Sequence, residues 1–134
     1  MNEECADVAR RPYLAGVKTL RPGVTFKEVC DAMNAPLLEK GCWNLTPLIH
    51  SMMPLLFVSA MRFDTTHLPG AGMFKGVKTI PVVGGDLVIK EGMVMELEPN
   101  ASRGMNRVNI GGTVIVTKNG VEELNKLASK MRVV

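Results

Sequence analysis

The feature that most constrains the fold of this chain is a change of hydrophobic pattern near residue 43. Before that point, apolar residues recur at spacings of three and four, which is typical of amphipathic helices. After it, short apolar runs are separated by prolines and glycines, which is typical of strands and turns. The sequence therefore predicts an α+β fold in which two N-terminal helices precede a mainly antiparallel sheet.

The first helix is predicted from one apolar face and ends before Pro22 and Gly23. Pro12 lies inside this stretch, lacks a backbone donor and crowds the preceding turn. Two alternatives follow: one kinked helix, or two pieces of which the second begins with Pro12 in its first turn. The residues of the apolar face are Ala6, Ala9, Tyr13, Val17 and Leu20.

A second helix is predicted to begin after Thr25, because Glu28 follows three residues later and completes the pattern of a capping box. Val24 and Val29 have the spacing of a hydrophobic staple. Gly41 is a natural stop for this helix. Its buried face is predicted to carry Phe26, Val29, Cys30, Met33 and Leu37.

Two strands are predicted in the second half of the chain. Residues 93–98 alternate between apolar and other side chains, so that Glu96 and Glu98 share one face. Residues 108–117 read as one long strand, closed by a turn at Asn119 and Gly120. Glycines 111 and 112 within that strand indicate either a bulge or a close approach of another segment. Residues 121–134 suit either a short helix or a strand.

Composition bounds the class of protein. With 134 residues, of which 46% are hydrophobic, the chain is long enough for one domain with a real core. The net charge of +3 is scattered along the sequence, so we expect no nucleic-acid partner. No apolar run is long enough for a membrane span, and the acidic N-terminus does not resemble a signal peptide. These patterns predict a cytoplasmic protein that does not insert into membranes.

Four side chains are candidates for chemistry. Glu96 and Glu98 on one strand face can bind a metal or divide acid and base roles, although charged residues on a wet sheet face give the same pattern. His50 lies in an apolar segment, where it is either a core histidine or a ligand. His67 lies in a segment rich in turn residues and reads as a loop residue.

Four segments in order resemble the C-terminal half of the pita-bread metallopeptidase family, which includes methionine aminopeptidase, Xaa-Pro aminopeptidase, prolidase and creatinase. The resemblance implies half of a pita-bread fold, with residues 1–134 forming a single truncated domain. The segment that ends in Glu98 and Pro99 is the most specific. The four segments are residues 20–25 (LRPGVT), 49–51 (IHS), 89–99 (IKEGMVMELEP) and 108–120 (VNIGGTVIVTKNG).

The resemblance also implies a set of site residues. Active members bind a pair of metal ions with two aspartates, a histidine and two glutamates, and the aspartates would precede this sequence. His50 matches the metal histidine, although serine follows it where the family has glycine, and Glu98 matches the first metal glutamate. The second glutamate position falls on Gly111, which has no side chain. His50, Glu96 and His67 are the candidate substrate-binding residues, and no catalytic residue is assigned.

These observations predict a non-catalytic module derived from a metallopeptidase, which binds a peptide or protein partner in a relic cleft and needs no cofactor. We also expect a homodimer, in which a second copy covers the surface of the missing half. One alternative is an Xaa-Pro type aminopeptidase or dipeptidase that uses zinc, manganese or cobalt and is active only when a partner chain supplies the missing ligands. The other is a metal-free hydrolase of the creatinase kind.

Overall fold

The computed structural model describes residues 2–42, 44, 47–53, 58–60, 82–103 and 106–125. Two helices come first, α1 (Asn2–Thr19) and α2 (Phe26–Glu39), and strands follow, which confirms the predicted α+β class. The strands are β1 (Ile49–Ser51), β2 (Ser59–Ala60), β3 (Val94–Leu97), β4 (Asn100–Arg103), β5 (Asn106–Asn109), β6 (Gly112–Thr117) and β7 (Gly120–Glu123).

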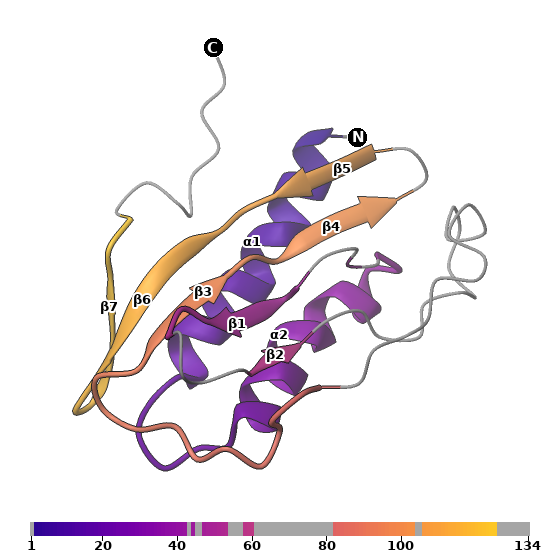
Figure 1. Ribbon diagram of the computed structural model, residues 1–134. Helices are drawn as coiled ribbons and strands as arrows, with labels where there is room; N and C mark the ends of the chain where they lie inside the picture. The colour runs from indigo at the N-terminus through magenta and orange to yellow at the C-terminus, as the bar shows by residue number, and fades with distance from the viewer. Residues whose placement is uncertain are drawn as a thin grey trace.

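Helix α1 is one continuous helix with Pro12 inside it, so the alternative of two pieces is wrong. Ala9 and Tyr13 of α1 are fully buried, as is Leu20 directly after the helix, which the spacing of these residues predicts. In Figure 1, α1 passes behind the strands along much of the length of the molecule. Burial of this face compensates for the backbone hydrogen bond that a proline removes from a helix.

Helix α2 begins and ends where local signals predict. The Thr25 Oγ1 accepts a hydrogen bond from the Glu28 N–H at 3.3 Å, and a Glu28 carboxylate oxygen accepts one from the Thr25 N–H at 2.6 Å. This second bond favours the ionised form and lowers the pKa of Glu28. At the other end, Gly41 has a φ of +62°, a conformation that favours glycine over other residues.

The strands form an antiparallel five-stranded sheet in the order β2, β1, β3, β6, β7, and β4 pairs with β5 in a separate ribbon. Leu97 pairs with Gly112 and Asn100 with Asn109, so one register runs through both ribbons. The chain segments 94–103 and 106–117 therefore make one long hairpin, which Figure 1 shows running from β3 and β6 to β4 and β5.

The prediction of one strand over residues 108–117 is wrong. The strand is divided into β5 and β6, with Ile110 and Gly111 between them. Pro99 lies opposite Ile110 in the hairpin and has no N–H to donate. The Ile110 N–H still donates to the Pro99 carbonyl at 3.0 Å. Because the register does not change across this gap, the glycines mark no bulge.

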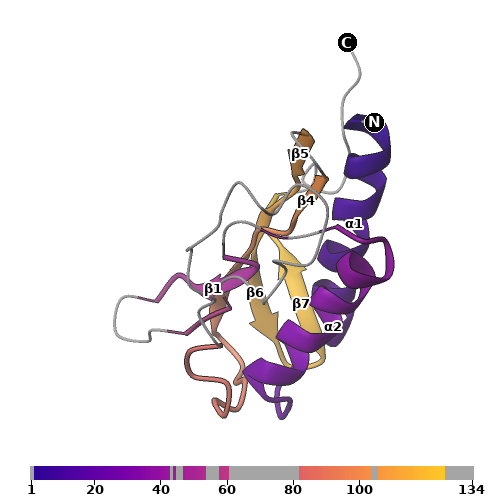
Figure 2. The same ribbon diagram turned by 90° about the vertical axis from the view of Figure 1, so that its right-hand side faces the viewer.

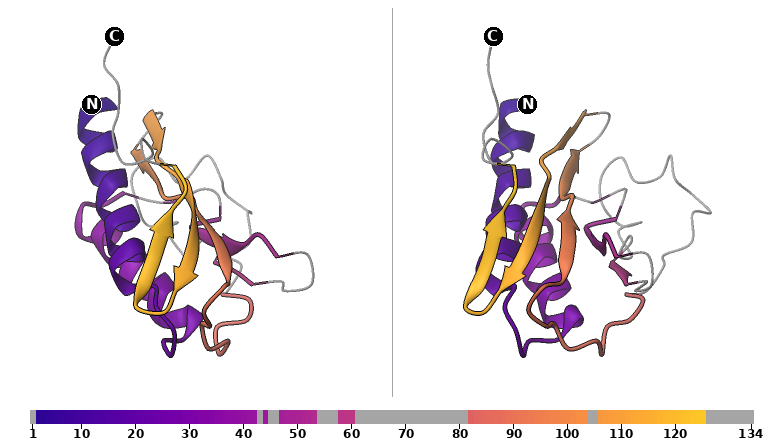
Figure 3. Two further views of the ribbon diagram at one scale, coloured as in Figure 1. Left: turned by 90° about the vertical axis from the view of Figure 1, so that its left-hand side faces the viewer. Right: turned by 60° about the vertical axis from the view of Figure 1, so that its left-hand side comes forward.

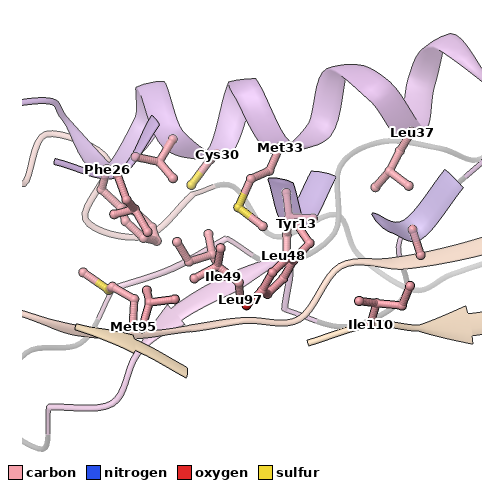
Figure 4. Close-up of a cluster of buried hydrophobic side chains, with 14 of the residues drawn as sticks. Tyr13, Phe26, Cys30, Met33, Leu37, Leu48, Ile49, Met95, Leu97 and Ile110 are labelled. Carbon is pink, nitrogen blue, oxygen red and sulfur yellow. The ribbon is translucent and has the colours of Figure 1, made fainter. Parts of the chain in front are cut away.

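Both helices lie on one face of the sheet (Figures 2 and 3). Apolar side chains of α2 point toward the strands, and Met95 and Leu97 of β3 meet them from below (Figure 4). Each of these two β3 side chains is fully buried. By the alternation of a strand, residues 94, 96 and 98 then belong to the opposite face, which we call the open face.

The buried apolar side chains from α2 are Phe26, Val29, Cys30, Met33 and Leu37, as predicted, and Asn34 is buried beside them in the sequence. Burial raises the pKa of the Cys30 thiol to about 12, so this cysteine is a small core residue. Among the helices of the described part of the chain, none is long and apolar enough to cross a membrane.

Candidate functional site

The open face carries the predicted site residues on three neighbouring strands. His50 of β1 pairs with Glu96 of β3, and Glu96 pairs in turn with Thr113 of β6. Glu98 lies two residues beyond Glu96, where its N–H donates to the Leu48 carbonyl at 3.0 Å and extends the pairing of β1 with β3. The antiparallel pairing thus brings together residues that are nearly 50 positions apart in the sequence.

His50 is in direct contact with Glu98. Its Nε2 lies 3.2 Å from a Glu98 carboxylate oxygen, and its Nδ1 lies 3.1 Å from the Ser51 carbonyl oxygen. The two side chains are 28% and 34% exposed, so the interpretation of His50 as a core histidine is wrong.

Glu96 is held by its cross-strand neighbour. The Thr113 hydroxyl donates a hydrogen bond to a Glu96 carboxylate oxygen. Glu96 and Glu98 are both half-buried and lie on one face, as the alternation predicts. Each carboxylate therefore has a partner within the sheet.

Gly111 lies directly opposite Glu98 in the hairpin, because the pairs on either side of it share one register. A Cβ at this glycine would lie 3.7 Å from the Glu98 Cγ, so a side chain at this position would adjoin the Glu98 side chain. The same Cβ would lie only 2.9 Å from the Leu97 carbonyl oxygen. The predicted close approach of another segment to Gly111 is confirmed.

The described residues do not fit a resident metal centre. The 3.2 Å between the His50 Nε2 and the Glu98 oxygen suits two ligands of one ion, because ligand bonds of about 2.1 Å place neighbouring ligand atoms about 3.0 to 3.4 Å apart. A hydrolytic zinc site ordinarily has three protein ligands. In the described ranges, no group of three or more His, Cys, Asp and Glu side chains is placed to hold a metal ion.

Sequence reasoning missed the residue that holds the hairpin beyond Glu98. The Asn44 side-chain carbonyl accepts a hydrogen bond from the Asn100 N–H at 2.9 Å, and both residues are buried. Pro99 has no N–H and cannot continue the pairing with β1. The Asn44 side chain therefore supplies the acceptor for the next backbone N–H, that of Asn100. Nothing local in the sequence marks Asn44 for this role, since its partner is 56 positions away. The candidate substrate-binding residue His67 lies outside the described residues.

Comparisons with known proteins agree with this architecture. The sequence matches the model of metallopeptidase family M24 over residues 2–118. A search of curated proteins gives no match. Among solved structures, X-Pro aminopeptidase from Thermotoga maritima is similar with a TM-score of 0.67 and 19% identity, covering 98% of this chain and 33% of that one.

Dipeptidase PepE from Mycobacterium ulcerans is similar with a TM-score of 0.64 and 23% identity, covering 92% of this chain and 29% of that one. Prolidase from Pyrococcus furiosus is similar with a TM-score of 0.62 and 20% identity, covering 98% of this chain and 33% of that one. This chain spans about a third of the length of these structures, and at such identities the similarity establishes the fold. A family match that extends from α1 to the end of β6, on a partial pita-bread fold, shows that the chain belongs to metallopeptidase family M24.

Proposed function

We propose that this chain is a non-catalytic member of family M24 that binds a peptide or protein partner on the open face of its sheet. The observation that carries the proposal is the glycine at position 111, directly opposite Glu98. A ligand at that position would complete a set of three with His50 and Glu98. Glycine supplies none, and a Cβ at this position would lie 2.9 Å from the Leu97 carbonyl oxygen, closer than ordinary van der Waals contact.

The polar groups that remain support a role in binding. His50 and Glu98 contact each other, and Thr113 donates to Glu96, so the face keeps a defined arrangement of donors and acceptors. His50 and Glu98 are also partly exposed, which leaves them accessible to a ligand. Fixed polar groups on a rigid sheet are suited to positioning a ligand by hydrogen bonds. Glu96 and His50 are the residues we assign to substrate or partner binding, together with His67.

Assembly is part of the proposal. The sheet of the described residues has β2 and β7 at its two edges. Exposed sheet edges favour association, and a two-fold homodimer is the simplest way to cover them. Light scattering should then give the mass of a dimer at micromolar concentration. A mass of one chain at that concentration would contradict the homodimer and leave peptide binding untouched.

One observation favours a second candidate, a hydrolase. The spacing of the His50 Nε2 and the Glu98 oxygen suits two ligands of a shared ion, and a partner chain with further carboxylates would complete such a centre. The same contact also favours the metal-free variant, in which His50 handles a proton with Glu98 as its partner. Both versions predict hydrolysis of an Xaa-Pro dipeptide, the first only with added zinc, manganese or cobalt.

The test combines a metal assay with an activity assay on the full chain, purified without a histidine tag. We expect far less than one metal ion per chain and no hydrolysis of Xaa-Pro dipeptides with or without added metal. Near-stoichiometric metal together with hydrolysis would overturn the proposal in favour of the metallopeptidase. Hydrolysis that persists in EDTA and is lost in His50→Ala would overturn it in favour of the metal-free enzyme.

Binding is tested separately, by titrating a library of short peptides against the full chain and following the chemical shift of His50. Glu98→Gln should weaken binding, because it removes the carboxylate that contacts this histidine. Glu39→Gln is the matched control, since Glu39 is an exposed residue at the end of α2, in the layer on the other face of the sheet. A library without any binder would contradict the proposed function.

A further inference from the structure

An apolar row crosses the open face next to the polar site residues. The Met52 N–H donates to the Val94 carbonyl at 3.0 Å, which continues the pairing of β1 with β3, and Val94 pairs with Ile115 of β6. Met52 lies two residues after His50 and therefore on the same face. Its side chain is 52% exposed, and Val94 and Ile115 are half-buried. The row Met52, Val94 and Ile115 is thus accessible apolar surface on a regular scaffold.

The next row along the strands is polar and is formed by His50, Glu96 and Thr113. Beyond this polar row lies Glu98, whose cross-strand neighbour is Gly111, a residue without a side chain. The chain therefore presents, in order along β3, an apolar position, a carboxylate and a second carboxylate.

Among the described residues of these rows, the side chains with a formal charge are carboxylates, and His50 is the one further titratable group. Glu122 pairs with Ile115 at the end of the apolar row, is exposed, and adds a third carboxylate to those of Glu96 and Glu98. Within these cross-strand rows of described residues there is no Lys or Arg. A ligand that covers the face gains from a cationic group, whereas a second copy docking by the same face would bring like charges together.

The spacing of the rows matches an extended peptide. Successive residues on one strand face are about 6.6 to 6.8 Å apart, and an extended peptide lying along the strands repeats its side chains at the same interval. An apolar side chain seated on the row of Met52, Val94 and Ile115 therefore places the side chain two residues away over Glu96. The side chain four residues away then lies over Glu98.

We propose that the open face selects extended peptide segments in which a Lys or Arg follows or precedes an apolar residue at a spacing of two. This inference rests on the proposed function and adds the chemical class of the partner. The apolar row supplies contact area, and the carboxylate of Glu96, one row away, selects the basic side chain. The peptide ends play no part, so internal segments of a protein qualify as partners.

The experiment uses capped peptides, acetylated and amidated, so that no terminal charge contributes. The reference probe has the sequence Gly-Leu-Ser-Lys-Gly, and two further probes replace its Lys by Glu or its Leu by Ser. Affinities for the full chain are measured by fluorescence anisotropy at low and high salt. We expect the Glu probe to bind about tenfold more weakly at low salt, because like charges meet on the face, and the Ser probe to bind about fivefold more weakly.

Variants of the protein identify the surface. Glu96→Gln should reduce the preference for Lys over Glu about threefold, in the range of an exposed ion pair, because the Lys of the probe lies two residues from its Leu and therefore over Glu96. Met52→Ser should reduce the preference for Leu over Ser. Glu39→Gln should change neither preference. High salt should remove most of the preference for Lys and little of that for Leu.

The outcomes separate this inference from the proposed function. Equal affinity for the Lys and Glu probes in the unmodified chain overturns the inference, while binding of both keeps the proposed function. A preference for Lys that Glu39→Gln reduces as much as Glu96→Gln also overturns it, because the charge then acts without regard to the face. If no capped or uncapped peptide binds, both fail together.

Discussion

Replacing Gly111 by alanine tests whether the hairpin is closed at the position where the family resemblance implies a ligand. The added Cβ would lie 2.9 Å from the Leu97 carbonyl oxygen, about 0.5 Å inside ordinary van der Waals contact. That oxygen belongs to the backbone of a central strand of the sheet, so it has little freedom to move. Gly111→Ala should therefore strain the hairpin.

The size of the effect follows from two opposing contributions. Overpacking of this kind costs about 1 to 3 kcal/mol. The φ angle of Gly111 is not positive, so alanine also reduces the entropy of the unfolded chain and recovers about 0.4 to 1 kcal/mol. The net expectation is a loss of roughly 1 to 2 kcal/mol in the free energy of unfolding, which lowers the urea midpoint by about 0.5 to 1 M at an m-value of about 2 kcal/mol/M.

The matched control is Gly120→Ala. Gly120 also has no positive φ, and a Cβ there would meet no heavy atom within 4 Å. Its urea midpoint should stay within about 0.3 M of the unmodified chain, as for an ordinary surface substitution. If Gly111→Ala is as stable as this control, the Leu97 carbonyl does not exclude a side chain at position 111. The argument against a ligand there then rests on the missing side chain alone.

Four further predictions concern the helices and the site. Thr25→Ala should lower the free energy of unfolding by about 1 kcal/mol in urea titration, because it removes the N-cap of α2. Because the pKa of Glu28 is lowered in the folded chain, its ionised side chain contributes to the free energy of unfolding at neutral pH, and this contribution is lost as the pH falls below the ordinary pKa of about 4.3. A Glu28→Gln variant whose free energy of unfolding falls with acid as much as that of the unmodified chain would refute this. Because burial raises the pKa of Cys30 to about 12, mass spectrometry should find this thiol unmodified by iodoacetamide at pH 8 until urea unfolds the chain. EDTA should leave the thermal unfolding midpoint unchanged, whereas a drop of several degrees would indicate a bound metal ion.

The sequence predicts well the features that local signals determine. Helix α2 is an example, because Thr25 and Glu28 contact each other within one turn and Gly41 needs only its own φ. The alternation around Glu96 and Glu98 is equally local, since a strand with one buried face imposes it. These features need no knowledge of the rest of the fold.

Features that depend on distant partners could not be predicted in the same way. The division of the strand at Ile110 becomes visible only when Pro99 is placed opposite it. The buried contact of Asn44 with Asn100 is likewise set by the packing of two segments far apart in the sequence. His50 remained ambiguous because an apolar neighbourhood suits a core histidine, and only the register of β1 with β3 brings Glu98 within hydrogen-bond distance.

The site residues that the structure describes on the open face are paired with one another. A buried or half-buried carboxylate without a partner is costly, so losing a metal ion would ordinarily destabilise the residues that bound it. Here Glu98 is paired with His50, and Glu96 accepts a hydrogen bond from Thr113. Because each carboxylate has a side-chain partner within the sheet, this pairing offsets part of the cost of partly burying their charge.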